Sequence, residues 1–333
     1  MKLSDLKNFR DFFWNLPLVK ASLDWTQQHS LPGFFKVPIY DVLVFLFNEV
    51  RRFDLLTRAN SIAFSFFLAL FPSIIVIFTL VPYFADYILS FFNFTTQNFL
   101  DVLQNEIRQV LPGEKGVGTL LFDTISDLAT TERAGLLSFG FALAIFFASN
   151  GMLSMMRSFE KSHLKTFKKR HPLKKRGIAI LLTLQVGFLL IVSVFLIILG
   201  REIIGWLSEY IRGAGFSTVG IYIIRWVAIL SLFYISIAII YRYGAATYRK
   251  FSIFSPGATL ATILSIISSV AFSFYVDNFG AYNRIYGPIG TIMVVMLWIQ
   301  LNALVLLIGF ELNASIAVNR DLKEELPDEE LEE

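Results

Sequence analysis

The sequence predicts an all-α polytopic membrane protein with six transmembrane helices plus amphipathic interfacial helices. Two observations predict this fold class. Hydrophobic residues make up 55% of the 333-residue chain and charged residues only 17%, whereas soluble domains carry about 25% charged residues. In addition, six stretches are apolar on all faces and long enough to cross a bilayer, which takes about 20 helical residues.

The sequence predicts three regions, with all six spans in the middle one. In lipid, backbone groups must bond within their own segment, which favours helices, and the alternating segments of a membrane β-barrel are not found. Residues 1–52 form an amphipathic cytoplasmic or interfacial region, residues 53–318 the transmembrane domain and residues 319–333 an acidic cytoplasmic tail, since Asp321–Glu333 holds eight acidic residues and one lysine. The spans are expected at about residues 60–84, 136–156, 177–200, 221–243, 256–276 and 287–314.

The N-terminal region and the first loop are predicted to lie on the membrane rather than across it. Residues 1–35 lack the continuous apolar core and the small-residue cleavage site of a signal peptide. A surface-lying amphipathic segment and a soluble cytoplasmic helix pair both fit them. Tyr87–Leu111 places apolar residues at helical spacing and ends at Pro112 and Gly113. We expect this segment to be an interfacial helix outside the membrane.

The first span contains Pro72 near its middle. Proline removes one backbone hydrogen bond, so we expect a kink or a break in this helix. Discontinuous helices mark binding sites in many transporters, although a simple kink is the commoner outcome.

Basic residues give the predicted orientation, because cytoplasmic loops are enriched in Lys and Arg. The second loop, Arg157–Arg176, holds nine basic residues, and the fourth loop adds Arg242, Arg249 and Lys250. The loops that would face the other side are poorer in basic residues. We therefore expect both termini in the cytoplasm and anionic lipid headgroups at the Arg157–Arg176 loop.

The residue types that carry most enzyme chemistry are absent or scattered. There is no cysteine, which excludes disulfides, thiol nucleophiles and thiolate metal sites. The three histidines form no metal-ligand pattern, and neither a phosphate-binding glycine loop nor a nucleophile motif is found. We expect no catalytic residue, no cofactor and no metal site. Nucleic acid is not expected as a partner either, because the basic loop lacks aromatic stacking platforms or a known RNA-binding fold.

A group of polar residues falls at the predicted cytoplasmic ends of the spans. Arg58 and Glu311 lie at similar depth in the first and sixth spans, and pairing them would lower the free-energy cost of holding each away from water. One interpretation is a gate or an ion-coupling site, and the other is a structural clamp between the first and last helices. This inner polar cluster consists of Arg58, Asn60, Asn150, Glu311 and Asn313.

A second polar group falls on the predicted outer side. Interfacial tyrosines commonly anchor helices, which is the simpler explanation for its aromatic members. The alternative is a site for an anion or a lipid headgroup built on two arginines. This outer polar cluster consists of Arg225, Tyr282, Asn283 and Arg284.

Four motifs resemble the YihY/virulence factor BrkB family of bacterial inner-membrane proteins over about residues 40–318. They are Arg58–Phe64 running on to Leu70–Pro72; Ser149–Gly151; Ser255–Ala258; and a final set of Tyr275, Tyr282, Asn283, Tyr286, Gly287, Ile289, Gly290, Trp298 and Gly309–Ala314. The family usually has Ala before the glutamate, where this chain has Phe310. The resemblance implies a six-helix protein of the bacterial inner membrane, which is the predicted location.

Three functions follow as hypotheses. The first is a transporter or exporter of a lipid, a lipid-linked molecule or a small anion, with the inner polar cluster as its gate or site. The second is a non-transporting envelope scaffold that acts through the N-terminal region, the first loop or the acidic tail. The third is a membrane-associated ribonuclease, a label long carried by the family. It is the least favoured because the sequence lacks a metal-binding cluster that would activate water. Membrane lipids are the expected partners, and a homo-oligomer is left open.

Overall fold

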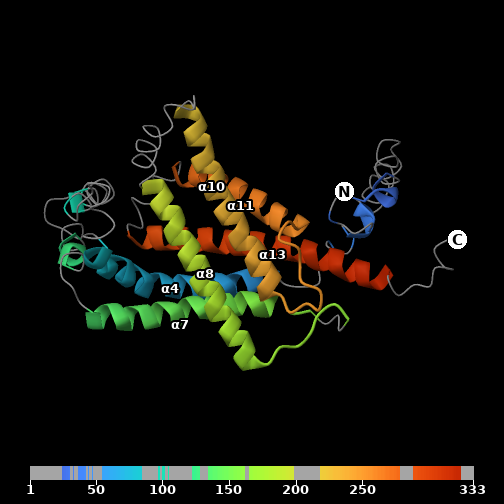
Figure 1. The fold of residues 1–333 in the computed structure, drawn as a ribbon, viewed down its shortest axis with the longest axis horizontal. Coiled ribbons are helices and arrows are strands. Elements are labelled where there is room, and N and C mark those ends of the chain that lie inside the picture. Colours follow the sequence, from blue (N-terminus) through green and yellow to red (C-terminus); the bar gives the residue numbers. More distant parts are fainter. Residues whose placement is uncertain are drawn as a thin grey trace, which may run out of the picture. The chain divides into compact units, whose positions relative to one another are not determined.

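The computed structural model describes residues 25–30, 33, 37–42, 44, 47, 55–84, 97, 100–101, 104, 122–127, 134–161, 165–198, 218–277 and 288–323. In these parts of the chain the long elements are all helices, and six of them are long and apolar enough to cross a membrane (Figure 1). The predicted fold class is therefore confirmed. The helices are α4 (Leu55–Phe84), α7 (Ala134–Ser158), α8 (Pro172–Ile198), α10 (Thr218–Ile239), α11 (Pro256–Asp277) and α13 (Pro288–Lys323).

Proline marks the start of three of these helices, at Pro172, Pro256 and Pro288. The first helical position suits proline because its N–H would lack a partner there in any case. Ser255 precedes α11 and accepts a hydrogen bond on its Oγ from the backbone N–H of Ala258, at 3.4 Å. This is the usual action of an N-cap serine, so the Ser255–Ala258 motif begins a helix.

The helices extend beyond the predicted spans at several ends. α4 begins at Leu55 rather than residue 60, α8 at Pro172 rather than 177, and α13 ends at Lys323 rather than 314. Apolar length determines what crosses the bilayer, but backbone hydrogen bonds continue into charged residues on either side. Residues 319–323, predicted as part of the tail, thus belong to α13. Pro72 does not break α4, which is continuous across it.

The predicted interfacial helix and much of the two terminal regions fall outside the described residues. Of Tyr87–Leu111, only residues 97, 100, 101 and 104 are described, and each is helical. Of the tail beyond Lys323, nothing is described. The described helices and loops fall into two compact units, each with its own internal packing.

The first unit contains residues up to Ser61, residues 155–174 and all residues from Tyr234 onward. α11 packs along α13 in this unit (Figure 1). A Cβ atom placed on Gly309 would lie 2.6 Å from the carbonyl oxygen of Gly257 and 2.6 Å from Cβ of Ala261. Only glycine permits so close an approach of two helix backbones, as is common between membrane helices.

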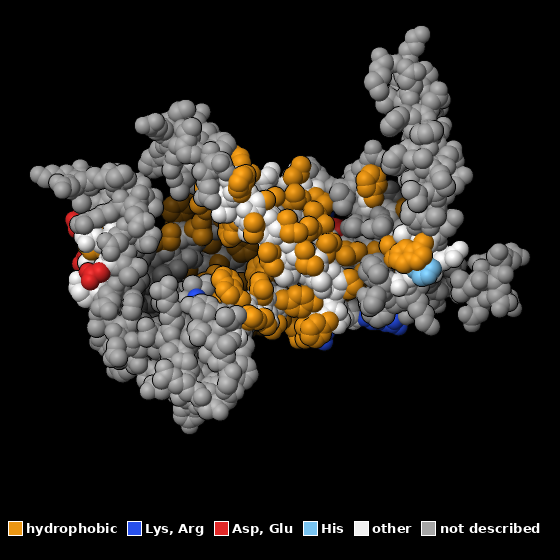
Figure 2. Space-filling model, turned by 90° about the horizontal axis from the view of Figure 1, so that it is seen from above, with side chains coloured by type: hydrophobic (Ala, Val, Ile, Leu, Met, Phe, Trp, Pro, Cys, Tyr) orange, Lys and Arg blue, Asp and Glu red, His pale blue; other side chains and the backbone are white. Residues whose placement is uncertain are grey.

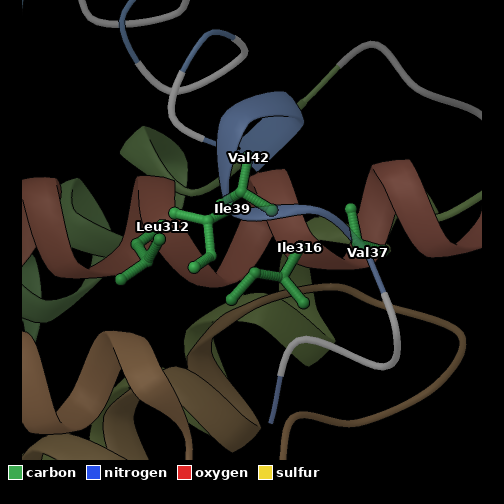
Figure 3. Packing of buried hydrophobic residues seen from close by; sticks show 5 residues of the cluster. All are labelled: Val37, Ile39, Val42, Leu312 and Ile316. Carbon is green, nitrogen blue, oxygen red and sulfur yellow. The ribbon is translucent and has the colours of Figure 1, made fainter. Parts of the chain in front are cut away.

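A segment from the N-terminal region also packs on α13. Val37, Ile39 and Val42 form a buried hydrophobic cluster with Leu312 and Ile316 (Figure 3). The side chains of Val37 and Val42 have no exposed surface. The N-terminal region is therefore attached to the last helix, over at least this short stretch, by apolar contact.

The second unit contains Ile62–Ser154 and Lys175–Phe233. α4 and α7 are neighbours here, because a Cβ on Gly151 would lie 2.8 Å from the ring of Phe66. α7 and α8 are joined by Arg176, which donates a hydrogen bond to the side-chain oxygen of Asn150 and lies 5.2 Å from the ring centre of Phe146.

Hydrophobic side chains cover much of the described surface on the face seen in Figure 2. Large apolar residues on the spans are strongly exposed, among them Phe139 at 64%, Phe188 at 64% and Val270 at 67%. Apolar exposure on this scale is unusual in a soluble monomer and is expected where a helix faces lipid. Together with the six spans, it identifies a multi-pass membrane protein.

Candidate functional site

Glu311, on α13, is the centre of the candidate site. Its side chain has no exposed surface, and Lys161 Nζ lies 2.6 Å from Oε2 and 2.8 Å from Oε1. Arg58 Nη1 lies 3.3 Å from Oε1. The side chain of Lys161 is only 3% exposed and that of Arg58 is 19% exposed. One carboxylate thus joins the last helix to the start of α4 and to the segment that follows α7.

The energetics of this ion cluster depend on its being complete. Taking a carboxylate out of water costs several kcal/mol, which only well-placed opposite charges and hydrogen bonds offset. Oε1 accepts hydrogen bonds from both cations. Oε2 has Lys161 within ion-pair distance but no hydrogen bond of good geometry. Removing one partner would leave a buried charge with much less compensation.

The end of α7 positions Lys161. The backbone N–H of Phe159 bonds to the carbonyls of Met155 and Met156, and that of Glu160 bonds to Arg157, so the last turn tightens before the chain leaves the helix. The ring of Phe159 then stacks on Phe310, with ring centres 4.1 Å apart and planes 18° apart. Phe310 immediately precedes Glu311, so this stack places Lys161 beside the carboxylate.

Phe310 is also the centre of a larger aromatic cluster. Its ring centre lies 6.2 Å from that of Tyr241, 6.1 Å from Phe251 and 6.4 Å from Phe167. The hydroxyl of Tyr241 donates a 2.6 Å hydrogen bond to the backbone carbonyl of Leu306, one turn before Phe310. Phe310 has no exposed surface. Phe310 therefore fills the space beside the ion cluster.

Asn313 lies close to Glu311 in sequence but has different partners. Its Oδ1 accepts a 2.8 Å hydrogen bond from the backbone N–H of Gly257, and its Nδ2 donates a 2.9 Å bond to Oγ of Ser255. Both bonds are buried. Asn313 thus fixes the start of α11 against α13, which is a packing function next to the ion cluster.

Two other predicted members of the inner polar cluster have different surroundings. Asn60 is exposed on α4. Asn150 belongs to the second unit, where it is held by Arg176. Of the predicted inner polar cluster, the structure therefore joins only Arg58 directly to Glu311.

The outer polar cluster is described only in part. Arg225 lies partly buried on α10. Tyr282, Asn283 and Arg284 lie outside the described residues, so their predicted grouping with Arg225 stays a prediction.

Lys161 is the residue that sequence reasoning missed as a member of the site. In the sequence, Lys161 is one of nine basic residues of the second loop that predict the orientation of the protein. Its neighbours in sequence do not distinguish it from the other eight. Its burial follows from the stacking of Phe159 on Phe310, two aromatic residues far apart in the chain.

The cluster forms a cross-link between three chain segments. Among the residues that the structure describes, no group of three or more His, Cys, Asp or Glu side chains could hold a metal ion. Glu311 pairs with Arg58 and Lys161, so it holds the three segments together as long as both ion pairs are intact.

Comparison with known proteins agrees with the sequence motifs. A model of the family described as virulence factor BrkB matches residues 46–332. A ribonuclease-like protein of Bacillus subtilis (strain 168), YfkH, is 32% identical over 287 residues, which cover 85% of this chain and 97% of that protein.

Shorter matches link the chain to proteins named for their membrane character alone. A UPF0761 membrane protein of Tolumonas auensis is 36% identical over 74 residues, covering 21% of this chain and 24% of that protein. One from Mannheimia succiniciproducens is 34% identical over 92 residues, covering 28% of this chain and 32% of that protein. No solved structure matches the chain.

Proposed function

Because this chain belongs to the virulence factor BrkB family of membrane proteins, we propose that it moves a lipid, a lipid-linked molecule or a small anion across the bacterial inner membrane. The ion cluster of Glu311, Lys161 and Arg58 is its inner gate. Both termini lie in the cytoplasm, as the basic loops favour.

The complete burial of Glu311 carries this proposal. Ionisable residues within membrane helices are costly and are functional by default, because an apolar contact would hold helices together more cheaply. The carboxylate and its two cations come from three segments of the chain, so separating them would release all three. A gate needs a contact of this kind. It is strong while all three charges are paired, and it weakens when one of them pairs with a substrate or an ion instead.

Flux measurements test the substrate classes. The purified full chain is reconstituted into vesicles that carry either a fluorescent phospholipid, whose exposure is read by dithionite, or trapped chloride, whose release is read by an electrode. Protein-dependent flux in one assay assigns the class. We expect Glu311→Gln to change that flux severalfold and Arg320→Gln to leave it unchanged, because Arg320 pairs with Asp321 on the partly exposed end of α13. Flux that is the same with and without protein in both assays contradicts the proposal.

A scaffold function is the second candidate, and a specific observation favours it. Glu311, Lys161 and Asn313 are sealed in contacts between helices, as in a permanent clamp, and the N-terminal segment 37–42 is fixed to α13. A scaffold requires no opening of these contacts at any time. It would act through the N-terminal region, the first loop or the tail.

Cysteine labelling separates the gate from the clamp. The chain has no cysteine, so a single introduced thiol reports unambiguously. Ser315 is fully buried one turn after Glu311 and donates a hydrogen bond to its carbonyl, whereas Asn60 is exposed. A gate predicts that Ser315→Cys reacts with a membrane-impermeant thiol reagent, and faster when combined with Glu311→Gln. A clamp predicts that Ser315→Cys stays unreactive in the folded protein while Asn60→Cys reacts.

The ribonuclease-like name of the Bacillus relative leads to a third test. Purified protein is incubated with labelled RNA in the presence of several divalent metals and of a chelator. Cleavage that depends on a defined metal and co-purifies with the folded protein would replace the transport proposal by an enzymatic one.

A further inference from the structure

Two loops at the ends of the spans are locked together in the first unit. The first runs through residues 165–171 and the second through residues 242–255. Lys168 N–H donates a 2.7 Å hydrogen bond to the carbonyl of Ala246, and Tyr248 N–H donates a 3.1 Å bond to that of Thr166. They flank an antiparallel bridge between Phe167 and Thr247. Two loops that are separate in sequence therefore present one surface.

Arg170 strengthens this lock. Its guanidinium donates hydrogen bonds to the carbonyls of Tyr243, Gly244 and Ala245, at 2.9, 2.9 and 2.6 Å. These carbonyls end the short π-helix Ile240–Gly244 that follows α10, where they lack helical partners. Burial lowers the pKa of Arg170, partly opposed by the charge of Glu160, but an arginine stays charged at neutral pH.

The joined loops and the first turn of α8 expose both cations and large apolar side chains. Phe254 is 83% exposed, Leu173 77% and Tyr248 61%. Neither loop contains an aspartate or a glutamate. We call residues 165–174 and 242–254 the basic–aromatic platform; its exposed cations are Lys165, Lys168, Lys169, Lys174, Arg249 and Lys250.

Cations and rings are paired within the platform. Lys250 Nζ lies 4.5 Å from the ring centre of Tyr243, and Lys168 Nζ lies 5.7 Å from that of Tyr248. These are cation–π distances. Such pairing holds the ammonium groups next to the rings, so charge and apolar surface occur together across the platform rather than in separate patches.

We infer that the basic–aromatic platform is a docking surface for the acidic phospholipid headgroups of the leaflet in which it lies. Its cations would attract phosphate, and tyrosine and phenylalanine at span ends insert at headgroup level. The platform is continuous with three spans, since α8 and α11 begin at its edges and α10 leads into it. This inference is independent of transport, and it changes the lipid surface expected from Arg157–Arg176 alone. Lys161 is buried against Glu311 and the guanidinium of Arg170 is bonded to carbonyls, whereas residues 242–254 contribute further exposed cations.

Nucleic acid is the competing occupant of a basic and aromatic surface. Single-stranded RNA binds where bases stack on open aromatic faces. Here Lys168 and Lys250 already lie against the tyrosine rings. Phe254 and Leu173 also expose large apolar surfaces, which a polar ligand such as RNA would not cover favourably. Lipid fits both features.

Lipid-selective quenching tests the inference on the full chain in nanodiscs. Ser252 is exposed in the fourth loop, and Ser252→Cys introduces the chain's single thiol for a bimane label. Brominated phosphatidylglycerol should quench this label more than an equal fraction of brominated phosphatidylcholine, by roughly threefold or more at low salt and less at high salt. Equal quenching by the two lipids would overturn the inference.

Matched substitutions assign any effect to the platform. Lys250→Gln should lower the quenching ratio by about twofold or more. Arg157→Gln removes the same charge from an exposed position at the end of α7, outside the platform, and should leave the ratio unchanged. An equal fall in both variants would indicate general charge attraction and contradict a defined surface. Binding of a fluorescent RNA oligonucleotide to discs without acidic lipid, weakened by Lys250→Gln and not by Arg157→Gln, would assign the platform to nucleic acid instead.

Discussion

At the scale of single residues, the free energy of unfolding depends strongly on whether Glu311 is paired with both Lys161 and Arg58. Breaking a buried ion pair by removing one partner costs about 3–5 kcal/mol, whereas replacing both partners costs much less. We therefore expect Glu311→Gln and Lys161→Gln to destabilise the fold separately, and the double variant to lose less than the sum of the two. Unfolding of the purified protein in mixed micelles gives the three values.

A control for this cycle comes from the same helix. Arg320 pairs with Asp321, and both side chains are partly exposed. Exposed and partly exposed pairs contribute about 0–1 kcal/mol, so Arg320→Gln should change stability little. If Glu311→Gln is no more destabilising than Arg320→Gln, the ion cluster does not stabilise the fold.

Phe310 allows a second prediction at this scale. Phe310→Ala removes the ring that stacks on Phe159 and should cost about 3–5 kcal/mol, as truncation of a buried phenylalanine does. It should also let Lys161 move, which would be read as faster hydrogen exchange at residues 159–161. Phe254→Ala, at an 83% exposed position, is the matched control and should leave both measurements unchanged.

At the scale of elements, the crossing of α11 and α13 depends on two glycines. A Cβ on Gly257 would overlap the carbonyl of Gly309 and the side chain of Asn313. Gly257→Ala and Gly309→Ala should therefore destabilise the protein by about 1–3 kcal/mol, the usual range for overpacking. Melting temperature in detergent gives the comparison.

Gly187 is the matched control for these substitutions. It lies within α8 and has nothing within 4 Å of a Cβ placed on it. Because alanine favours a helix over glycine, Gly187→Ala should be neutral or stabilising by up to about 1 kcal/mol. Destabilisation equal to that of Gly309→Ala would show that the crossing is not the cause.

At the scale of the whole molecule, the position of the loops relative to the membrane is the main prediction. Ser252 lies in the fourth loop, which its basic residues predict to be cytoplasmic, and Asp123 is an exposed residue of the long first loop. In intact cells, an impermeant thiol reagent should label Asp123→Cys and should label Ser252→Cys only after the membrane is opened. The reverse pattern would invert the orientation.

The spans were predictable because apolar length is a property of each segment alone. Partners in the site are a different matter. Sequence gives the depth of Arg58, Asn60, Asn313 and Glu311 along their helices, but not which helix face each side chain occupies. The predicted cluster is therefore only partly formed. Asn60 is exposed, and Asn313 bonds to Ser255 and Gly257 rather than to the ion cluster. Lys161 could not be recognised because its place depends on an aromatic stack between distant segments.

The contact between residues 37–42 and α13 has a consequence for how the protein is made. Val37, Val42 and Arg58 leave the ribosome early, but Leu312, Ile316 and Glu311 are synthesised some 250 residues later, the separation of Arg58 and Glu311 being 253 positions. At about 5–20 residues per second, the early segment waits roughly 10–50 seconds for its partner. During that interval its apolar side chains and a cation near the bilayer are uncovered. A nascent chain that stops before α13 would therefore keep these apolar side chains exposed, and insertion of the last helix would cover them.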